Sequence, residues 1–350
     1  MLPYWIVFSF AIVWMGLIAL QESDEFGRIP TLRFATRWLF VAILSLFVGV
    51  YSENGSLDYQ NYVDFLIETP PVAEWGLSSL KDPFFQSLGL AFASHDGNLG
   101  TLTFVTTFLS LGIKMKILDS RYYENVFSLA MIFLIGRFFL LHEFTQIRAS
   151  LGIAFISLSI LGAIEKKWLL VLTGIVVAVF THLSTIAMLP VVLLACNTTV
   201  KVKLILLFLL IPLFLVIGVG VEVENFSRLE PYLTGDHLVT ENTLISFYFL
   251  FKTLVLVILL FQWTSLNSGM RCALMVSAYG LLLTLAFIQN NVLSLRLGEL
   301  TAVFDCICFA YFLKYSYKLE LFYAYVAGLV VAALLYFSST NIVYPISLNF

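Results

Sequence analysis

Charge is scarce in this sequence of 350 residues: only 12% of the residues are Asp, Glu, Lys or Arg. Hydrophobic residues make up 60% of the chain, and its mean hydropathy is +0.96. A soluble domain of this length has too little interior to bury so much apolar surface. The composition therefore excludes an ordinary soluble enzyme and predicts an integral membrane protein.

Cysteine is also rare, and the four cysteines fall in or beside apolar runs. A disulfide framework is therefore not expected. Cys306 and Cys308 alone do not predict a zinc site, because structural zinc normally takes four ligands. Walker, dinucleotide-binding and metalloprotease motifs are missing as well. We expect no cofactor, no bound metal and no nucleic-acid partner.

The apolar runs recur at the length that crosses a bilayer, about 17–25 residues. They predict an all-α polytopic membrane protein with about 12 transmembrane helices in a single domain, residues 1–350. The first run has no basic flank before it and no cleavage site after it, so we do not expect a cleaved signal peptide. The expected spans are 2–20, 33–50, 99–113, 125–141, 147–164, 168–181, 183–196, 203–220, 244–262, 272–289, 297–313 and 319–338.

Most of the basic residues fall in short loops that alternate with loops poor in Lys and Arg. The positive-inside rule puts the basic loops on the cytoplasmic face and both termini outside. The cations assigned to the cytoplasmic face are Arg28, Arg33, Arg37, Lys114, Lys116, Arg121, Lys166, Lys167, Lys201, Lys203, Arg271, Lys314 and Lys318.

Some cations depart from this pattern and fall inside apolar runs or on the outer side. Ionisable groups in such places are costly and usually serve a function. Arg137 fits a snorkelling or ion-paired side chain, and Lys252 fits a buried partner for Asp305. The cations that depart from the pattern are Lys81, Arg137, Arg148, Arg228, Lys252 and Arg296.

The first of two long predicted outer loops, 51–98, carries several candidate binding residues. Asp58, Tyr59 and Tyr62 lie on one side of a helical turn, which puts a carboxylate beside two aromatic faces. Residues 84–94 are apolar but too short to span a bilayer. We therefore expect a short re-entrant or interfacial helix in this outer loop.

Further cations gather on the same predicted face. Arg148, His182 and Arg296 stand at the outer ends of predicted spans, and Arg228 lies in the second outer loop, 221–243. Arginine forms bidentate hydrogen bonds with phosphate oxygens and does not lose its proton. Such groups at lipid-headgroup depth suit the binding of a lipid diphosphate.

Several short elements follow one another along the chain: Asp58-Tyr59-x-x-Tyr62, Asp82-Pro83-Phe84-Phe85, Gln146-Ile147-Arg148, Phe180-Thr181-His182 with Ser184, and Arg296. Their order and shared side of the membrane resemble the EpsG branch of the Wzy-type polysaccharide polymerases, over about residues 51–300. The family pattern tends to have Glu before the proline, where this chain has Asp82.

The resemblance implies an enzyme of the bacterial inner (cytoplasmic) membrane with a GT-C-like fold, acting on the outer face. Such polymerases transfer a growing glycan from undecaprenyl diphosphate onto the next lipid-linked oligosaccharide repeat unit, without metal or nucleotide sugar. The implied partners are undecaprenyl-diphosphate-linked oligosaccharide, the lipid bilayer and a chain-length regulator. Neither the sugars nor the product class, O-antigen, capsule or exopolysaccharide, follows from the sequence.

These residues suggest a mechanism with a single, inverting displacement. Arg148 and Arg296, with Arg228, hold the donor diphosphate as charge gathers on it. Asp58 is the preferred general base, and His182 and Asp82 are the other candidates. The remaining expected contacts with diphosphate or glycan are Tyr59, Tyr62 and Lys81.

Three other functions fit parts of the sequence. A flippase for lipid-linked oligosaccharides also needs outer cations, but an internal repeat would be expected and none is visible. A GT-C transferase that uses a lipid-phosphate sugar would place an acidic pair such as Asp24-Glu25 outside, whereas the basic loops place it in the cytoplasm. A membrane O-acyltransferase would centre on His182.

Overall fold

The computed structural model describes residues 2–22, 30–67, 82–93, 98–123, 126–195, 246–287, 291–316, 321–339 and 343. Within these ranges the regular structure is helical, apart from an isolated bridge between Ser56 and Val343. The predicted all-α fold is thus confirmed for the described part of the chain. The longer helices are α1 (Leu2–Glu22), α2 (Pro30–Gly55), α3 (Tyr59–Ile67), α4 (Pro83–Phe92), α5 (Gly100–Leu118), α6 (Phe127–Phe133), the π-helix η3 (Leu134–Thr145), α7 (Ile147–Ile164), α8 (Trp168–Thr181), α9 (Leu189–Ala195), α12 (Phe247–Phe261), α13 (Ser268–Ala286), α14 (Asn291–Glu299), α15 (Ala302–Tyr311) and α16 (Leu321–Ser339).

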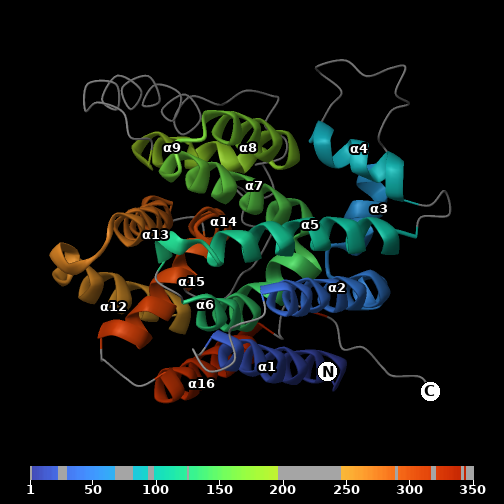
Figure 1. Ribbon diagram of the computed structural model, residues 1–350. Helices are drawn as coiled ribbons and strands as arrows, with labels where there is room; N and C mark the ends of the chain where they lie inside the picture. Colours follow the sequence, from blue (N-terminus) through green and yellow to red (C-terminus); the bar gives the residue numbers. More distant parts are fainter. Residues whose placement is uncertain are drawn as a thin grey trace.

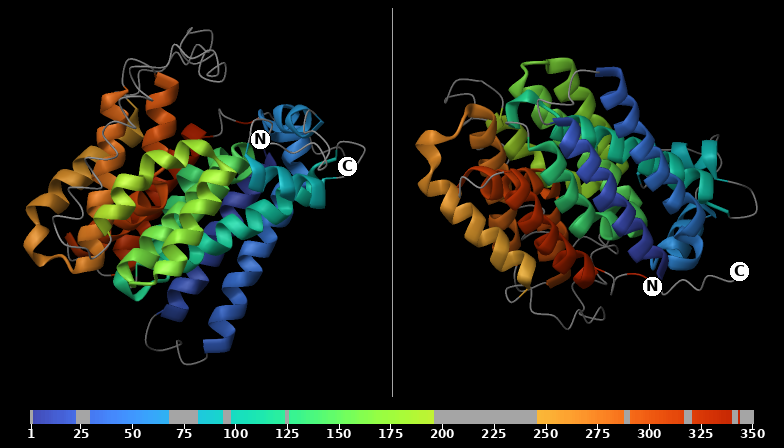
Figure 2. Two further views of the ribbon diagram at one scale, coloured as in Figure 1. Left: turned by 90° about the horizontal axis from the view of Figure 1, so that it is seen from above. Right: turned by 60° about the horizontal axis from the view of Figure 1, so that its bottom comes forward.

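The helices stack in layers, as Figure 1 shows. Helix α8 packs on α7, α7 packs on α5, and α5 packs on α2. Helices α1 and α16 lie side by side along the lower edge of Figure 1, where the ring of Phe8 stacks on that of Tyr336 at 4.2 Å. Figure 2 shows the short helices α3 and α4 grouped at one end of this bundle.

Six of the described helical segments are long and apolar enough to cross a membrane. A helix satisfies its own backbone hydrogen bonds, which a bilayer interior requires. Four predicted spans correspond to apolar helices that are shorter, at 168–181, 183–195, 247–261 and 326–337. The predicted span 203–220 lies outside the described residues. The six long segments are Leu2–Ala19, Phe34–Gly55, Gly100–Leu118, Phe127–Thr145, Ile147–Ile164 and Ser268–Ala286.

The predicted span 297–313 is not one continuous helix. Helix α14 ends at Glu299, and α15 begins at Ala302. Asp305 in α15 accepts hydrogen bonds from Tyr248, from Ser277 and, at 3.2 Å, from Thr301 at the break. The break is therefore fixed by side chains of α12 and α13, which the apolar run itself does not reveal.

The ion pair predicted between Lys252 and Asp305 is confirmed. Lys252 Nζ lies 2.8 Å from Asp305 Oδ2, and both side chains are almost fully buried. Lys252 Nζ also donates to Thr301 Oγ1 at 3.0 Å. Because a buried charge is tolerated only when it is paired and hydrogen-bonded, this pair ties α12 to the break between α14 and α15.

Lys114 was expected in a cytoplasmic loop, and that prediction is wrong. The residue lies inside α5 with no exposed surface. Its Nζ is 2.5 Å from Glu143 Oε1 in η3 and 2.8 Å from Ser150 Oγ in α7. Ser110 Oγ donates to the same Glu143 oxygen at 3.2 Å. This buried network joins α5, η3 and α7.

Candidate functional site

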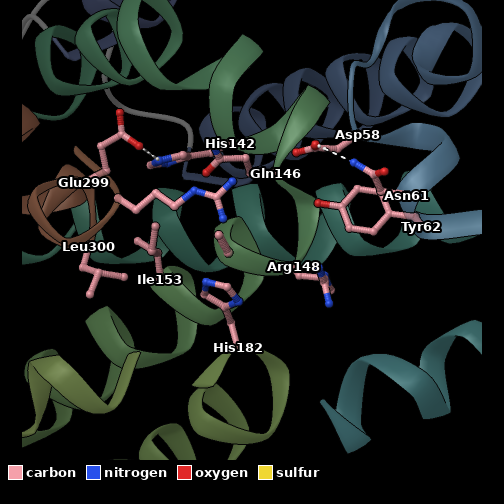
Figure 3. Close-up of a pocket in the computed structure, with 12 residues that line it drawn as sticks. Asp58, Asn61, Tyr62, His142, Gln146, Arg148, Ile153, His182, Glu299 and Leu300 are labelled. Atoms are coloured by element: carbon pink, nitrogen blue, oxygen red, sulfur yellow. Dashed lines mark hydrogen bonds and ion pairs between the residues drawn. The ribbon is translucent and has the colours of Figure 1, made fainter. Parts of the chain in front are cut away.

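One cavity of about 250 Å³ is lined by residues of α3 and by residues at three breaks between helices (Figure 3). One interruption is Gln146, between η3 and α7; another is His182, after α8; the third follows Glu299, the last residue of α14. Helix ends bring polar groups into an otherwise apolar bundle. The lining residues are Asp58, Asn61, Tyr62, His142, Gln146, Arg148, Ala149, Ile153, His182, Arg296, Glu299 and Leu300.

Arg148 stands in the first turn of α7 and is held from several sides. Its Nη1 donates to Asp82 Oδ2 at 2.9 Å. Its Cζ lies 4.6 Å from the centre of the Phe65 ring and 5.3 Å from that of Tyr62. A guanidinium fixed by a carboxylate and aromatic faces loses little entropy when it binds an anion. Arg148 is thus a preorganised cation at the cavity wall.

Asp82 lies behind Arg148 and is not among the residues that line the cavity. It is buried, with 7% of its surface exposed, and it precedes Pro83, the first residue of α4. Its φ of 113° lies in the left-handed region, which residues with a side chain rarely adopt. Such strain persists only where surrounding contacts hold it. The geometry favours Asp82 as a partner for Arg148 over Asp82 as a base.

The two tyrosines of α3 occupy different places. Tyr62 lines the cavity and donates its hydroxyl to the carbonyl of Thr145 at 3.1 Å. Burial raises the pKa of Tyr62 to about 12, so the phenol stays protonated at neutral pH. Tyr59 is not a lining residue; its hydroxyl accepts from the Leu99 amide at 2.8 Å. Tyr59 therefore anchors α3 to the start of α5.

Asp58 and Arg296 come to the same cavity from distant parts of the sequence. Asp58 directly precedes α3, is half-buried, and accepts from Asn61 Nδ2 at 3.2 Å. Arg296 belongs to α14, which packs against α13. The cavity therefore combines two arginines, counting Arg148, with a carboxylate that is partly open to water.

His182 interrupts the chain between α8 and the 3-10 turn Leu183–Met188, with extended backbone angles of −157° and 107°. Helix α7 approaches it closely at Gly152. A Cβ atom at Gly152 would lie 3.0 Å from the Cβ of His182. Glycine at this position therefore lets His182 stay at the cavity wall.

Sequence reasoning missed His142 and assigned no function to Glu299. Both are buried and line the cavity. Glu299 Oε2 is 3.7 Å from His142 Nε2, and its Oε1 is 3.5 Å from Arg137 Nη2. Of the two roles expected for Arg137, snorkelling or ion-paired, the structure thus shows the ion pair. The adjacent polar pair His142-Glu143 within an apolar run was a signal that could have identified this position.

Other predicted residues cannot be placed. Lys81, Arg228 and the loop 221–243 lie outside the described residues. In the described ranges, no group of three or more His, Cys, Asp or Glu side chains is arranged to hold a metal ion.

Comparison with known proteins identifies the family. The search of the curated proteins and the search of the solved structures find no significant match. The model of the EpsG family matches residues 36–349, which include every residue that lines the cavity. With nearly the whole length matched, the chain belongs to the EpsG family, the family of Wzy-type polysaccharide polymerases.

Proposed function

We propose that this chain is a polysaccharide polymerase that joins lipid-linked oligosaccharide units at the outer face of the bacterial inner membrane. Membership of the EpsG family supports the polymerase role, and the apolar helices support a multi-pass membrane protein. In this proposal about 12 spans form a GT-C-like bundle with both termini outside. The carrier is undecaprenyl diphosphate, and a chain-length regulator is a further partner.

The observation that carries this proposal is the meeting of Arg148 and Arg296 in one cavity. When the glycosidic bond to the carrier breaks, negative charge gathers on the departing diphosphate. Two guanidinium groups beside the departing diphosphate, one of them preorganised, stabilise that charge more than they stabilise the intact donor. The proposed reaction is a direct displacement that inverts the anomeric carbon.

The size of the cavity fits a reacting centre better than a whole substrate. Small-molecule sites usually measure roughly 300–1,000 Å³, and this one measures about 250 Å³. In the proposal, the cavity holds the diphosphate and the adjoining sugar, while the rest of each glycan stays outside. Tyr62, Asp58 and His182 contact the sugar or the diphosphate from the wall, and Asp58 is the base that the sequence favoured.

Arg148 and Arg296 form the proposed diphosphate clamp. The variant Asp82→Asn tests whether Asp82 supports this clamp by holding Arg148. It keeps the shape of the side chain and removes the charge that faces Arg148. Since a hydrogen bond to a charged group contributes about 1.5–3 kcal/mol, we expect the yield of long glycan to fall about tenfold or more. Densitometry of the glycan ladder in a complemented deletion strain measures this. Asp64→Asn, which changes an exposed carboxylate on α3, is the matched control and should leave the ladder unchanged.

The glycan profile of a strain lacking the gene tests the function itself. A polymerase predicts that single repeat units accumulate on the lipid carrier at the outer face, while the ladder of longer chains is lost. Units trapped at the inner face would indicate a flippase. Chains of normal length without acyl groups would indicate an acyltransferase. Either of these results would overturn the proposal.

A further inference from the structure

His142 is a buried polar side chain that lacks hydrogen-bond partners within the described part of the chain, as a residue that binds a ligand would. It has no exposed surface, and neither ring nitrogen has a hydrogen-bond partner among the described residues. Buried polar groups are almost always hydrogen-bonded, so each exception needs an explanation. Because His142 also lines the cavity, a substrate group bound there would supply the missing partner.

The surroundings of His142 suit proton transfer. Glu299 Oε2 lies 3.7 Å from Nε2, so the carboxylate can orient the ring and stabilise the imidazolium ion. The ring stacks on Phe138, with centroids 5.0 Å apart, which restricts its rotation. In Figure 3, Glu299 and His142 lie toward one side of the cavity, and Asp58 and Tyr62 lie toward the other.

We infer that His142 is the proton acceptor for the attacking sugar hydroxyl and that Glu299 is the residue that positions it. This inference rests on the proposed polymerase function. The hydroxyl oxygen forms a bond to the anomeric carbon of the donor while its proton passes to His142. The bond from that carbon to the phosphate oxygen breaks, and its electron pair stays on the diphosphate beside Arg148 and Arg296. The imidazolium ion then returns its proton to the departing diphosphate or to water.

His142 fits this role better than Asp58. An imidazole is matched to accepting and releasing a proton near neutral pH. Asp58 is half-buried and already accepts a hydrogen bond from Asn61. His142 is fully buried and has the carboxylate of Glu299 beside its ring. Asp58 then serves to hold the sugar.

The test uses membranes that carry each variant, mixed with lipid-linked repeat units extracted from the deletion strain. For His142→Gln we expect kcat to fall about 10²–10⁴-fold, with KM changed less than about threefold. In His142→Ala, added imidazole should restore part of the rate, which it would not do if the residue only supported the fold. Glu299→Gln should lower kcat by about tenfold or more with little change in KM, and Glu299→Asp should recover part of the loss.

A control variant and the unmodified protein separate a failure of this inference from a failure of the proposed function. Ser157→Ala removes another buried side chain that has no hydrogen-bond partner, away from the cavity lining, and should leave the rate unchanged. If the unmodified protein lengthens the units and His142→Gln does so at the same rate, the inference is wrong and the polymerase function stands. The inference is also wrong, and the polymerase function also stands, if Asp58→Asn abolishes turnover while imidazole does not raise the rate of His142→Ala. If the unmodified protein does not lengthen the units at all, the proposed function itself fails.

Discussion

Replacing either Arg148 or Arg296 with alanine is expected to abolish long glycan chains while the protein remains in the membrane. Both residues line the cavity in which the diphosphate would depart. Removing one donor that stabilises developing charge typically costs about 10²–10³-fold in rate. Losing both should leave only single lipid-linked units. The glycan ladder in complemented deletion cells, normalised to the protein level, measures the effect.

A conservative substitution at Arg148 and a control substitution outside the cavity show whether the loss of glycan comes from the clamp. Arg148→Lys keeps the charge but not the planar fork, so it should retain only part of the activity. Arg271→Ala is the matched control, because Arg271 binds the carbonyls of Trp263 and Thr264 and does not line the cavity. A full-length ladder from Arg148→Ala at normal protein levels would show that the proposed clamp does not exist.

The variant Lys114→Met should strongly destabilise the described bundle. It leaves Glu143 charged and buried without its cation. Removing one partner of a buried ion pair costs about 3–5 kcal/mol of unfolding free energy, whereas replacing both partners with apolar residues costs much less. We therefore expect Lys114→Met to lower the thermal midpoint of the detergent-solubilised protein far more than Lys114→Met combined with Glu143→Met does.

Lys116 provides the control on the same helix. Its side chain is exposed, two residues beyond Lys114 in α5. Lys116→Met removes the same charge without burying another one, and its midpoint should stay close to that of the unmodified protein. Equal midpoints for Lys114→Met and Lys116→Met would contradict the argument.

Most helices could be predicted from the sequence, because an uninterrupted apolar run has few alternatives to a helix in a bilayer. The prediction failed where a tertiary contact decides the structure. Lys114 looked like a loop residue because its partner, Glu143, lies 29 residues further along the chain. The break after Glu299 was missed because the side chains that hold it come from α12 and α13.

The candidate site was predictable to the extent that charge is out of place in a membrane. Arg148 and Arg296 were selected for this reason, and they do line one cavity. It was harder to predict which of two neighbouring residues in the sequence lines the cavity. Tyr59 and Tyr62 share a short helix, yet only Tyr62 lines the cavity, because the angle at which α3 packs is set by residues outside it. His142 was overlooked because it falls in the short segment between the predicted spans 125–141 and 147–164, whereas in the structure it is buried within η3.

The twelve-residue π-helix η3 has a consequence for how the site tolerates change. Its wider turns, such as the bond from the Gln146 amide to the carbonyl of Leu141, place more residues in each turn than an α-helix does. In an α-helix, deleting one residue turns every later side chain by about 100° around the axis. In η3 the same deletion can be absorbed when a wide turn closes to an α-helical turn, so Arg148 beyond it keeps its direction. The segment η3 should therefore tolerate the loss of one residue better than the neighbouring α-helices do.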